Sequence, residues 1–154
     1  MPLNLFKNAG LAASIAMAIG FSAELRADAG KSIDVYRDPN CSCCTKWISY
    51  LKDKGYTVRD HEEENMSAVK EKLGVPANLG SCHTGVVNGR FVDGHVPVEQ
   101  IAELTKRSDL IGAAAPGMPV GSPGMESGGR RSAYQIMGLK KSGDEVVLAD
   151  YPSQ

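Results

Sequence analysis

The sequence has few aromatic residues, little net charge and no long hydrophobic run. Phe, Trp and Tyr make up 6% of the 154 residues, and the formal net charge is −1. A charge near zero argues against a nucleic-acid-binding protein, which usually carries a basic surplus. The short apolar runs exclude a multi-pass membrane protein, and the 42% hydrophobic content excludes a long disordered tail. One small globular domain fits these figures.

The first 27 residues have the pattern of a cleaved signal peptide. Lys7 precedes an uncharged, mostly apolar run from Ala9 to Phe21, whose 13 residues are too few to span a bilayer comfortably. Small residues follow, and cleavage after Ala27 leaves residues 28–154 as a single domain. A single N-terminal anchor or a buried helix is the alternative interpretation. We expect export to the periplasm, where Cys residues become disulfides or metal thiolates, and no stable membrane insertion after cleavage.

The rest of the chain alternates between strand and helix patterns. The expected elements are a strand at 33–36, a helix from Asn40 or Cys41 to Gly55 with Asn40 as its N-cap, a strand at 56–59, a helix from Asn65 to Gly74, a hairpin at 84–92 and a helix from Pro97 to Arg107. This order places a Cys-x-x-Cys at the first strand-to-helix turn. It predicts an α/β fold with a thioredoxin-like mixed sheet and flanking helices.

A different kind of sequence occupies residues 112–129. Six Gly and three Pro fill half of its eighteen positions, so we expect a Gly/Pro/Met-rich loop without long regular elements. Pro-Gly-Met occurs there twice, ending at Met118 and at Met125. Beyond the loop, residues 134–139 and 145–151 predict a C-terminal β-hairpin.

Cysteine is scarce, with four in the chain, but three of them lie within Cys41-Ser42-Cys43-Cys44. At the start of a helix, unpaired N–H groups and the dipole favour thiolate, the form that binds metal or attacks a disulfide. A redox pair or a structural disulfide of Cys41 and Cys44 leaves Cys43 as an extra nucleophile, which invites scrambling. A soft-metal site uses all three, because Cu(I) prefers thiolate and thioether ligands. Structural zinc usually shows two separated ligand pairs, so it fits the spacing less well.

Two later loops carry further ligand candidates. In a thioredoxin-like layout, Cys82 lies beside the first helix and completes a four-thiolate site or pairs with one of the first three Cys. His83 is next to it and can add an imidazole, and His95 precedes the third helix, where a surface or capping role is the alternative. His61 stands in a run of Glu, which favours a solvated face over a site.

The two Pro-Gly-Met methionines are candidates of another kind. A Met in a Gly/Pro loop has little helix or strand face on which to pack, so Met118 and Met125 can bring thioethers to a nearby site. Thioether adds affinity for Cu(I) or Ag(I) and little for zinc. The alternative is that both side chains pack the loop onto the core. Met66 and Met137 lie in a helix and a strand and are assigned to packing.

Five ordered motifs resemble a known family. They are the segments 36–47, 74–76, 81–84, 94–97 and 116–126. Together they resemble the CopG-like family of exported copper-resistance and predicted metal-binding proteins. Where this chain has Ser42, that family often has Gly, another small residue that is no soft-metal ligand. The resemblance implies a thioredoxin-like fold, a periplasmic location and a role in copper resistance. The implied metal ligands are Cys41, Cys43, Cys44, Cys82, His83, His95, Met118 and Met125.

Two functional hypotheses follow. The first is a periplasmic copper-binding protein that holds Cu(I), in its fullest form as a thiolate-bridged cluster of several ions that cycles between Cu(I) and Cu(II). Its partners are copper ions and other periplasmic copper-handling proteins, with no nucleic acid. The second is a periplasmic thiol–disulfide oxidoreductase that uses Cys41 and Cys44. A purely structural role for the cysteines is the third interpretation.

Overall fold

The structure is a computed structural model that describes residues 31–154. The predicted signal peptide, residues 1–27, lies outside this part of the chain. The elements, in order, are β1 (Ser32–Arg37), α1 (Ser42–Asp53), β2 (Thr57–Glu62), α2 (Met66–Leu73), the 3-10 turn η2 (Ala77–Leu79), β3 (His83–Val87), β4 (Arg90–Asp93), α3 (Val98–Lys106), β5 (Leu110–Ala114), β6 (Tyr134–Lys140) and β7 (Glu145–Tyr151). Among residues 31–154, no helix combines the length and apolar character needed to cross a bilayer.

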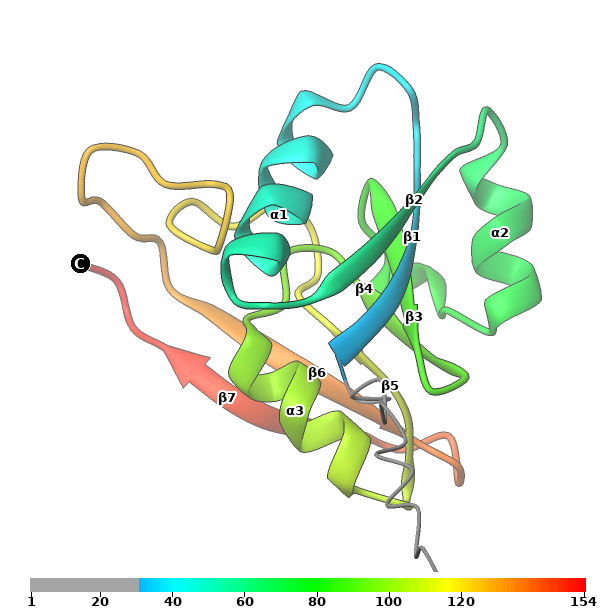
Figure 1. The fold of residues 1–154 in the computed structure, drawn as a ribbon. Coiled ribbons are helices and arrows are strands. Elements are labelled where there is room, and N and C mark those ends of the chain that lie inside the picture. Colours follow the sequence, from blue (N-terminus) through cyan, green and yellow to red (C-terminus); the bar gives the residue numbers. More distant parts are fainter. Residues whose placement is uncertain (1–30) are drawn as a thin grey trace, which may run out of the picture.

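The strands form one mixed sheet in the order β2-β1-β3-β4-β5-β6-β7. The pairs β1/β2 and β4/β5 are parallel, and the other neighbours are antiparallel. Helices α1 and α3 pack on one face of the sheet, while α2 and η2 lie against the other (Figure 1). The predicted mixed α/β sheet with flanking helices and a C-terminal β-hairpin is therefore confirmed.

The first helix buries one face against the sheet. Cys44, Trp47, Ile48 and Leu51 recur at helical spacing and are all buried. The expected N-cap at Asn40 is wrong, because Cys41 occupies that position. Asn40 belongs instead to a tight turn in which its backbone N–H donates to the Asp38 carboxylate at 2.7 Å. This turn places Cys41 at the start of the helix.

Strand β5 was not among the expected elements. It begins two residues before the Gly/Pro/Met-rich loop and inserts between β4 and β6. The strand contains few residues that favour β-structure, so local propensity does not predict it. Packing explains its residues instead: a Cβ at Gly112 would lie 2.2 Å from the ring of Phe91 on β4, so the aromatic ring needs a glycine beside it.

Residues 115–133, which contain the rest of this loop, connect β5 to β6 and are called the strap below. It runs beside α1 in yellow to orange (Figure 1). At Gly124 the backbone φ is +82°, and an added Cβ would lie 2.8 Å from the backbone nitrogen of Trp47. Glycine therefore allows both the turn and the close approach to α1. The strap is held against the helix that begins with the cysteines.

Candidate metal centre

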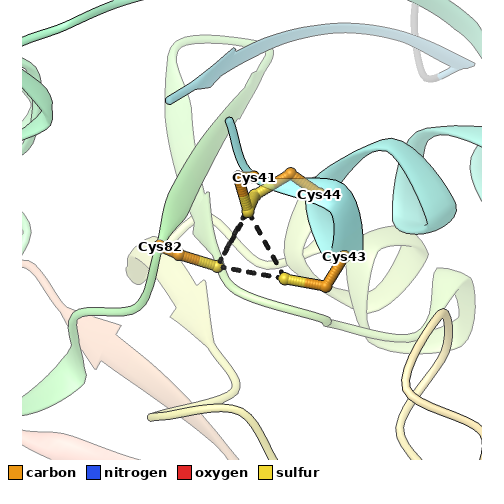
Figure 2. Close-up of side chains that lie close together, drawn as sticks. All are labelled: Cys41, Cys43, Cys44 and Cys82. Atoms are coloured by element: carbon orange, nitrogen blue, oxygen red, sulfur yellow. Dashed lines mark hydrogen bonds between the residues drawn. A yellow bond between two sulfur atoms is a disulfide. The ribbon is translucent and has the colours of Figure 1, made fainter. Parts of the chain in front are cut away.

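The four cysteines meet where α1 begins (Figure 2). Cys41 and Cys44 are joined by a disulfide with an S–S distance of 2.04 Å, and Cys43 and Cys82 are free thiols. Three of the sulfurs come from the first helical turn and its N-cap. The fourth arrives on the loop between η2 and β3. We call these four residues the cysteine cluster.

The sulfur atoms are mutually close. The Sγ of Cys82 lies 3.5 Å from those of Cys41 and Cys44 and 3.7 Å from that of Cys43. Cys41 and Cys43 are 3.3 Å apart, and all four sulfurs lie within 4.8 Å of one another. The structure thus brings Cys82 to the helix start, where the sequence placed it. Four sulfurs at this spacing can converge on one soft cation or bridge several.

The Cys82 thiol is held in its neutral form when no metal is bound. Burial, followed by the neighbouring Cys43 thiol, raises the pKa of Cys82 to about 12. The charge of Lys70 acts in the opposite direction with a smaller effect. A bound cation would displace the proton, because it is the thiolate that coordinates metal.

His83 presents one ring nitrogen to the cysteine cluster. Its ring is fully buried between Trp47, at a centroid distance of 4.5 Å, and His95, at 5.0 Å. Nε2 lies 3.1 Å from the carbonyl oxygen of Gly94, so Nε2 carries the hydrogen and donates it. Burial lowers the pKa of His83 well below its usual value, so the ring is neutral. Its Nδ1 therefore has a lone pair, 3.8 Å from Cys82 Sγ.

His95 is arranged in the opposite tautomer. Its buried ring donates Nδ1–H to the carbonyl oxygen of Pro123 in the strap at 2.7 Å. Nε2 is left with the lone pair and has no hydrogen-bond partner among residues 31–154. Burial lowers the pKa of His95 as well. A histidine whose second ring nitrogen is held by a backbone carbonyl has the arrangement typical of metal ligands.

Two ligand groups therefore share Cys82. One is the cysteine cluster, which offers sulfur alone. The other combines Cys82 with His83 and His95, whose ligand atoms also lie within 4.8 Å of one another. Thiolate sulfur suits Cu(I), whereas imidazole also suits Cu(II) and zinc. The donor set fits a soft or borderline metal.

The two candidate methionines lie in the strap, and their role as ligands stays a prediction. Met118 is 44% exposed and lines an open pocket of about 650 Å³ together with Met137. Met125 is half-buried in a tight turn that its N–H closes on the carbonyl of Ser122 at 2.8 Å.

His61 lies outside both ligand groups. It is on the edge strand β2, where its Nε2 pairs with the Asp34 carboxylate at 2.8 Å. Its side chain is 39% exposed, and the solvated face expected for this residue agrees with that position.

A buried ionic network beside the centre was missed at the sequence level. Lys70 on α2 forms an ion pair with Asp93 at the end of β4, and Thr84 on β3 hydrogen-bonds to both. The one available signal was a lysine on the same helical face as Met66 and Leu73. That signal is weak, because lysines on short helices are usually solvated.

Comparisons with known proteins agree with this description. Residues 79–125 match the model of a family described as a protein of unknown function, DUF411. Two solved structures of a copper resistance protein CopG, forms 1 and 2, are each 60% identical to this chain with a TM-score of 0.77. Each match covers 79% of this chain, and it covers 97% of the form 1 chain and 98% of the form 2 chain. No curated protein matches the sequence.

The similarity extends well beyond the cysteine motif. Identity of 60% over most of both chains exceeds what a shared fold alone requires, and the matched family segment contains Cys82 and both buried histidines. The chain therefore belongs to the family of the copper resistance protein CopG.

Proposed function

We propose that this protein binds copper in the periplasm and serves copper resistance by holding Cu(I) on the cysteine cluster. The observation that carries the proposal is the meeting of four sulfurs within 4.8 Å at the start of α1. The name of the 60% identical relatives supports copper as the cargo. Thiolate is the ligand that Cu(I) prefers, and the helix start favours that form.

The cysteine cluster and the residues around it would contribute different ligands to copper. Cys41, Cys43, Cys44 and Cys82 supply thiolates and can bridge several Cu(I) ions. His83 and His95 complete the coordination through lone pairs that their backbone hydrogen bonds already orient. Met118 and Met125 would add thioethers from the strap.

The state of the Cys41–Cys44 pair sets the capacity of the site. As a disulfide the pair leaves two thiols in the cluster, and reduction by an external dithiol, which is itself oxidised to a disulfide, restores four. The reverse step is balanced by copper itself: oxidation of two thiolates to a disulfide releases two electrons, which reduce two Cu(II) to two Cu(I). Run in either direction, this exchange would cycle bound copper between Cu(II) and Cu(I).

The location and the domain organisation belong to the same proposal. Residues 1–27 would direct export and be removed, and residues 28–154 would act as a single thioredoxin-like domain. The strand order β2-β1-β3-β4, with α1 following β1, supports that assignment. Other periplasmic copper-handling proteins would be its partners. Fractionation of cells that express the full chain should place the shortened protein in the periplasm, and full-length protein in the cytoplasm would contradict export.

An anaerobic Cu(I) titration against a competing chelator tests the binding claim. We expect the reduced wild-type protein to bind Cu(I) tightly and the Cys43→Ser variant to bind fewer ions or bind more weakly. The variant in which Cys41, Cys43 and Cys44 are all Ser provides the baseline. If the wild type binds Cu(I) no more tightly than this triple variant, the proposal is wrong.

A thiol–disulfide oxidoreductase is the second candidate. The Cys41–Cys44 disulfide at the N-terminus of α1 favours it, since that position stabilises a thiolate on reduction. This function predicts catalysed reduction of insulin that depends on Cys41 and Cys44 but not on Met118 or Met125. A wild type that binds Cu(I) tightly and does not reduce insulin contradicts it.

A further inference from the structure

The ammonium group of Lys70 holds together the two strand ends that carry the buried ligand candidates. Its Nζ donates to the Thr84 hydroxyl at 2.8 Å, to the His83 carbonyl at 3.3 Å and to the Asp93 carboxylate. The Thr84 hydroxyl in turn donates to Asp93 at 2.7 Å. Thr84 and Asp93 are fully buried, and the Lys70 side chain is 16% exposed.

This network lies directly behind the metal centre. Thr84 on β3 and Asp93 on β4 are register partners. Each is followed or preceded in the chain by a residue of the site. Thr84 follows His83, and Asp93 is followed by Gly94, whose N–H donates to the His83 carbonyl at 3.2 Å. Lys70 thus shares that carbonyl with Gly94. Because side chains alternate across a strand, the network occupies the α2 face while His83 faces α1.

Stability alone does not account for such a network. Removing two charges from water is costly, and a buried ion pair can often be replaced by apolar residues at no loss of folding free energy. Helix α2 has no buried residue, so an apolar side chain at position 70 would serve its packing at least as well. The ion pair adds no packing that an apolar pair would lack, but it joins β3 to β4 at a defined spacing.

We propose that Lys70, through Asp93 and Thr84, is a positioning residue of the metal centre that sets the spacing of Cys82, His83 and His95. The inference rests on the proposed function. The ammonium group touches no ligand atom and acts through the His83 carbonyl and the β3/β4 register. Groups that orient metal ligands from outside the site typically contribute 10- to 100-fold in metal affinity.

The test removes the Lys70–Asp93 ion pair without leaving one of its charges buried and unpaired. The double variant Lys70→Met/Asp93→Asn is neutral and similar in shape, so we expect its urea unfolding midpoint to stay near that of the wild type. Its Cu(I) affinity should fall at least tenfold in an anaerobic chelator competition. Lys72→Met is the matched control, because it removes the same charge from an exposed position on the same helix. The control should bind Cu(I) as the wild type does.

Two further measurements keep the test decisive. In the metal-free double variant, the ring nitrogen resonances of His83 and His95 should shift relative to the wild type. Thr84→Val, which keeps the charges of Lys70 and Asp93, should shift them in the same direction, and this separates a change of position from the loss of the Lys70 charge that acts on His83 and Cys82. Thr84→Val, which removes the two hydroxyl bonds to Lys70 and Asp93 and keeps both charges, should lower Cu(I) affinity by a smaller factor and serves if the double variant does not fold. Unchanged affinity in the variant that folds overturns the inference and leaves the proposed function standing. A wild type without Cu(I) affinity overturns both.

Discussion

His95 donates its Nδ1–H to the carbonyl oxygen of Pro123 at 2.7 Å, and this bond joins the strap to the buried imidazole that shares a ligand group with Cys82. The carbonyl can only accept, so it determines which ring nitrogen carries the hydrogen. Gly94 does the same for the other nitrogen of His83. Two backbone carbonyls thereby give the two histidines opposite tautomers.

The first prediction concerns these tautomers. In the metal-free protein at neutral pH, His83 should carry its hydrogen on Nε2 and His95 on Nδ1, because each bond to a carbonyl requires a donor. Long-range proton–nitrogen NMR of the imidazoles distinguishes the two forms. A His95 with its hydrogen on Nε2 would contradict the bond to Pro123.

A second prediction concerns the seat of the strap on α1. Gly124→Ala should lower the free energy of unfolding by about 3 kcal/mol, since the left-handed backbone costs ~1–2 kcal/mol and overpacking adds ~1–3 kcal/mol. The added Cβ would lie 2.8 Å from the backbone nitrogen of Trp47, and a helix backbone yields little. Urea unfolding of the metal-free protein measures the loss.

The matched control for that substitution is Gly129→Ala. Gly129 has a similar φ of +77°, but nothing lies within 4 Å of an added Cβ. It should therefore show the backbone cost alone, about 1 kcal/mol. Equal losses in the two variants would mean that the strap is not pressed against α1.

The third prediction is a loss of stability on acidification. Burial lowers the pKa values of His83 and His95 below 6.5, so the unfolded chain binds more protons than the folded protein once the pH falls below that value. Stability is therefore complete above pH 6.5 and declines as the pH falls. Between pH 6.5 and 5.5 the free energy of unfolding should drop by about 1–2 kcal/mol.

Urea unfolding of metal-free protein across this pH range checks the slope. His95→Gln should make the drop smaller, because one of the two depressed groups is gone. A free energy of unfolding that rises as the pH falls would contradict the presence of buried neutral histidines. Metal-loaded protein is unsuitable for this measurement, since metal competes with protons for the same nitrogens.

A fourth prediction concerns the reactivity of Cys82 in the oxidised, metal-free protein. With its pKa raised to about 12 by burial and by Cys43, Cys82 should react with iodoacetamide at pH 8 far more slowly than in the unfolded chain. Mass spectrometry after timed alkylation measures the rate, and the same protein in urea is the reference. Alkylation of folded Cys82 at the unfolded rate would contradict the buried, neutral thiol.

Much of the fold was predictable, because local patterns and tertiary packing agree there. Trp47 and Leu51 repeat at helical spacing and are fully buried, and Asn88-Gly89 joins β3 to β4 as expected. Asn65 caps α2 by accepting the Ala68 N–H at 3.1 Å. Strand β5 was not predictable, because the fit of Gly112 beneath Phe91 is a contact between distant segments.

The candidate site divides along the same line. The sequence by itself determined the chemistry: three cysteines at one helix start, a fourth before a hairpin and two histidines in adjoining loops. Spacing along the chain was enough for this, because each cluster is local. Only the tertiary structure decided that the sulfurs lie within 4.8 Å, which imidazole nitrogens carry lone pairs, and that Lys70 ties β3 to β4 from behind. Those features depend on backbone carbonyls and buried charges from distant segments, which no local pattern encodes.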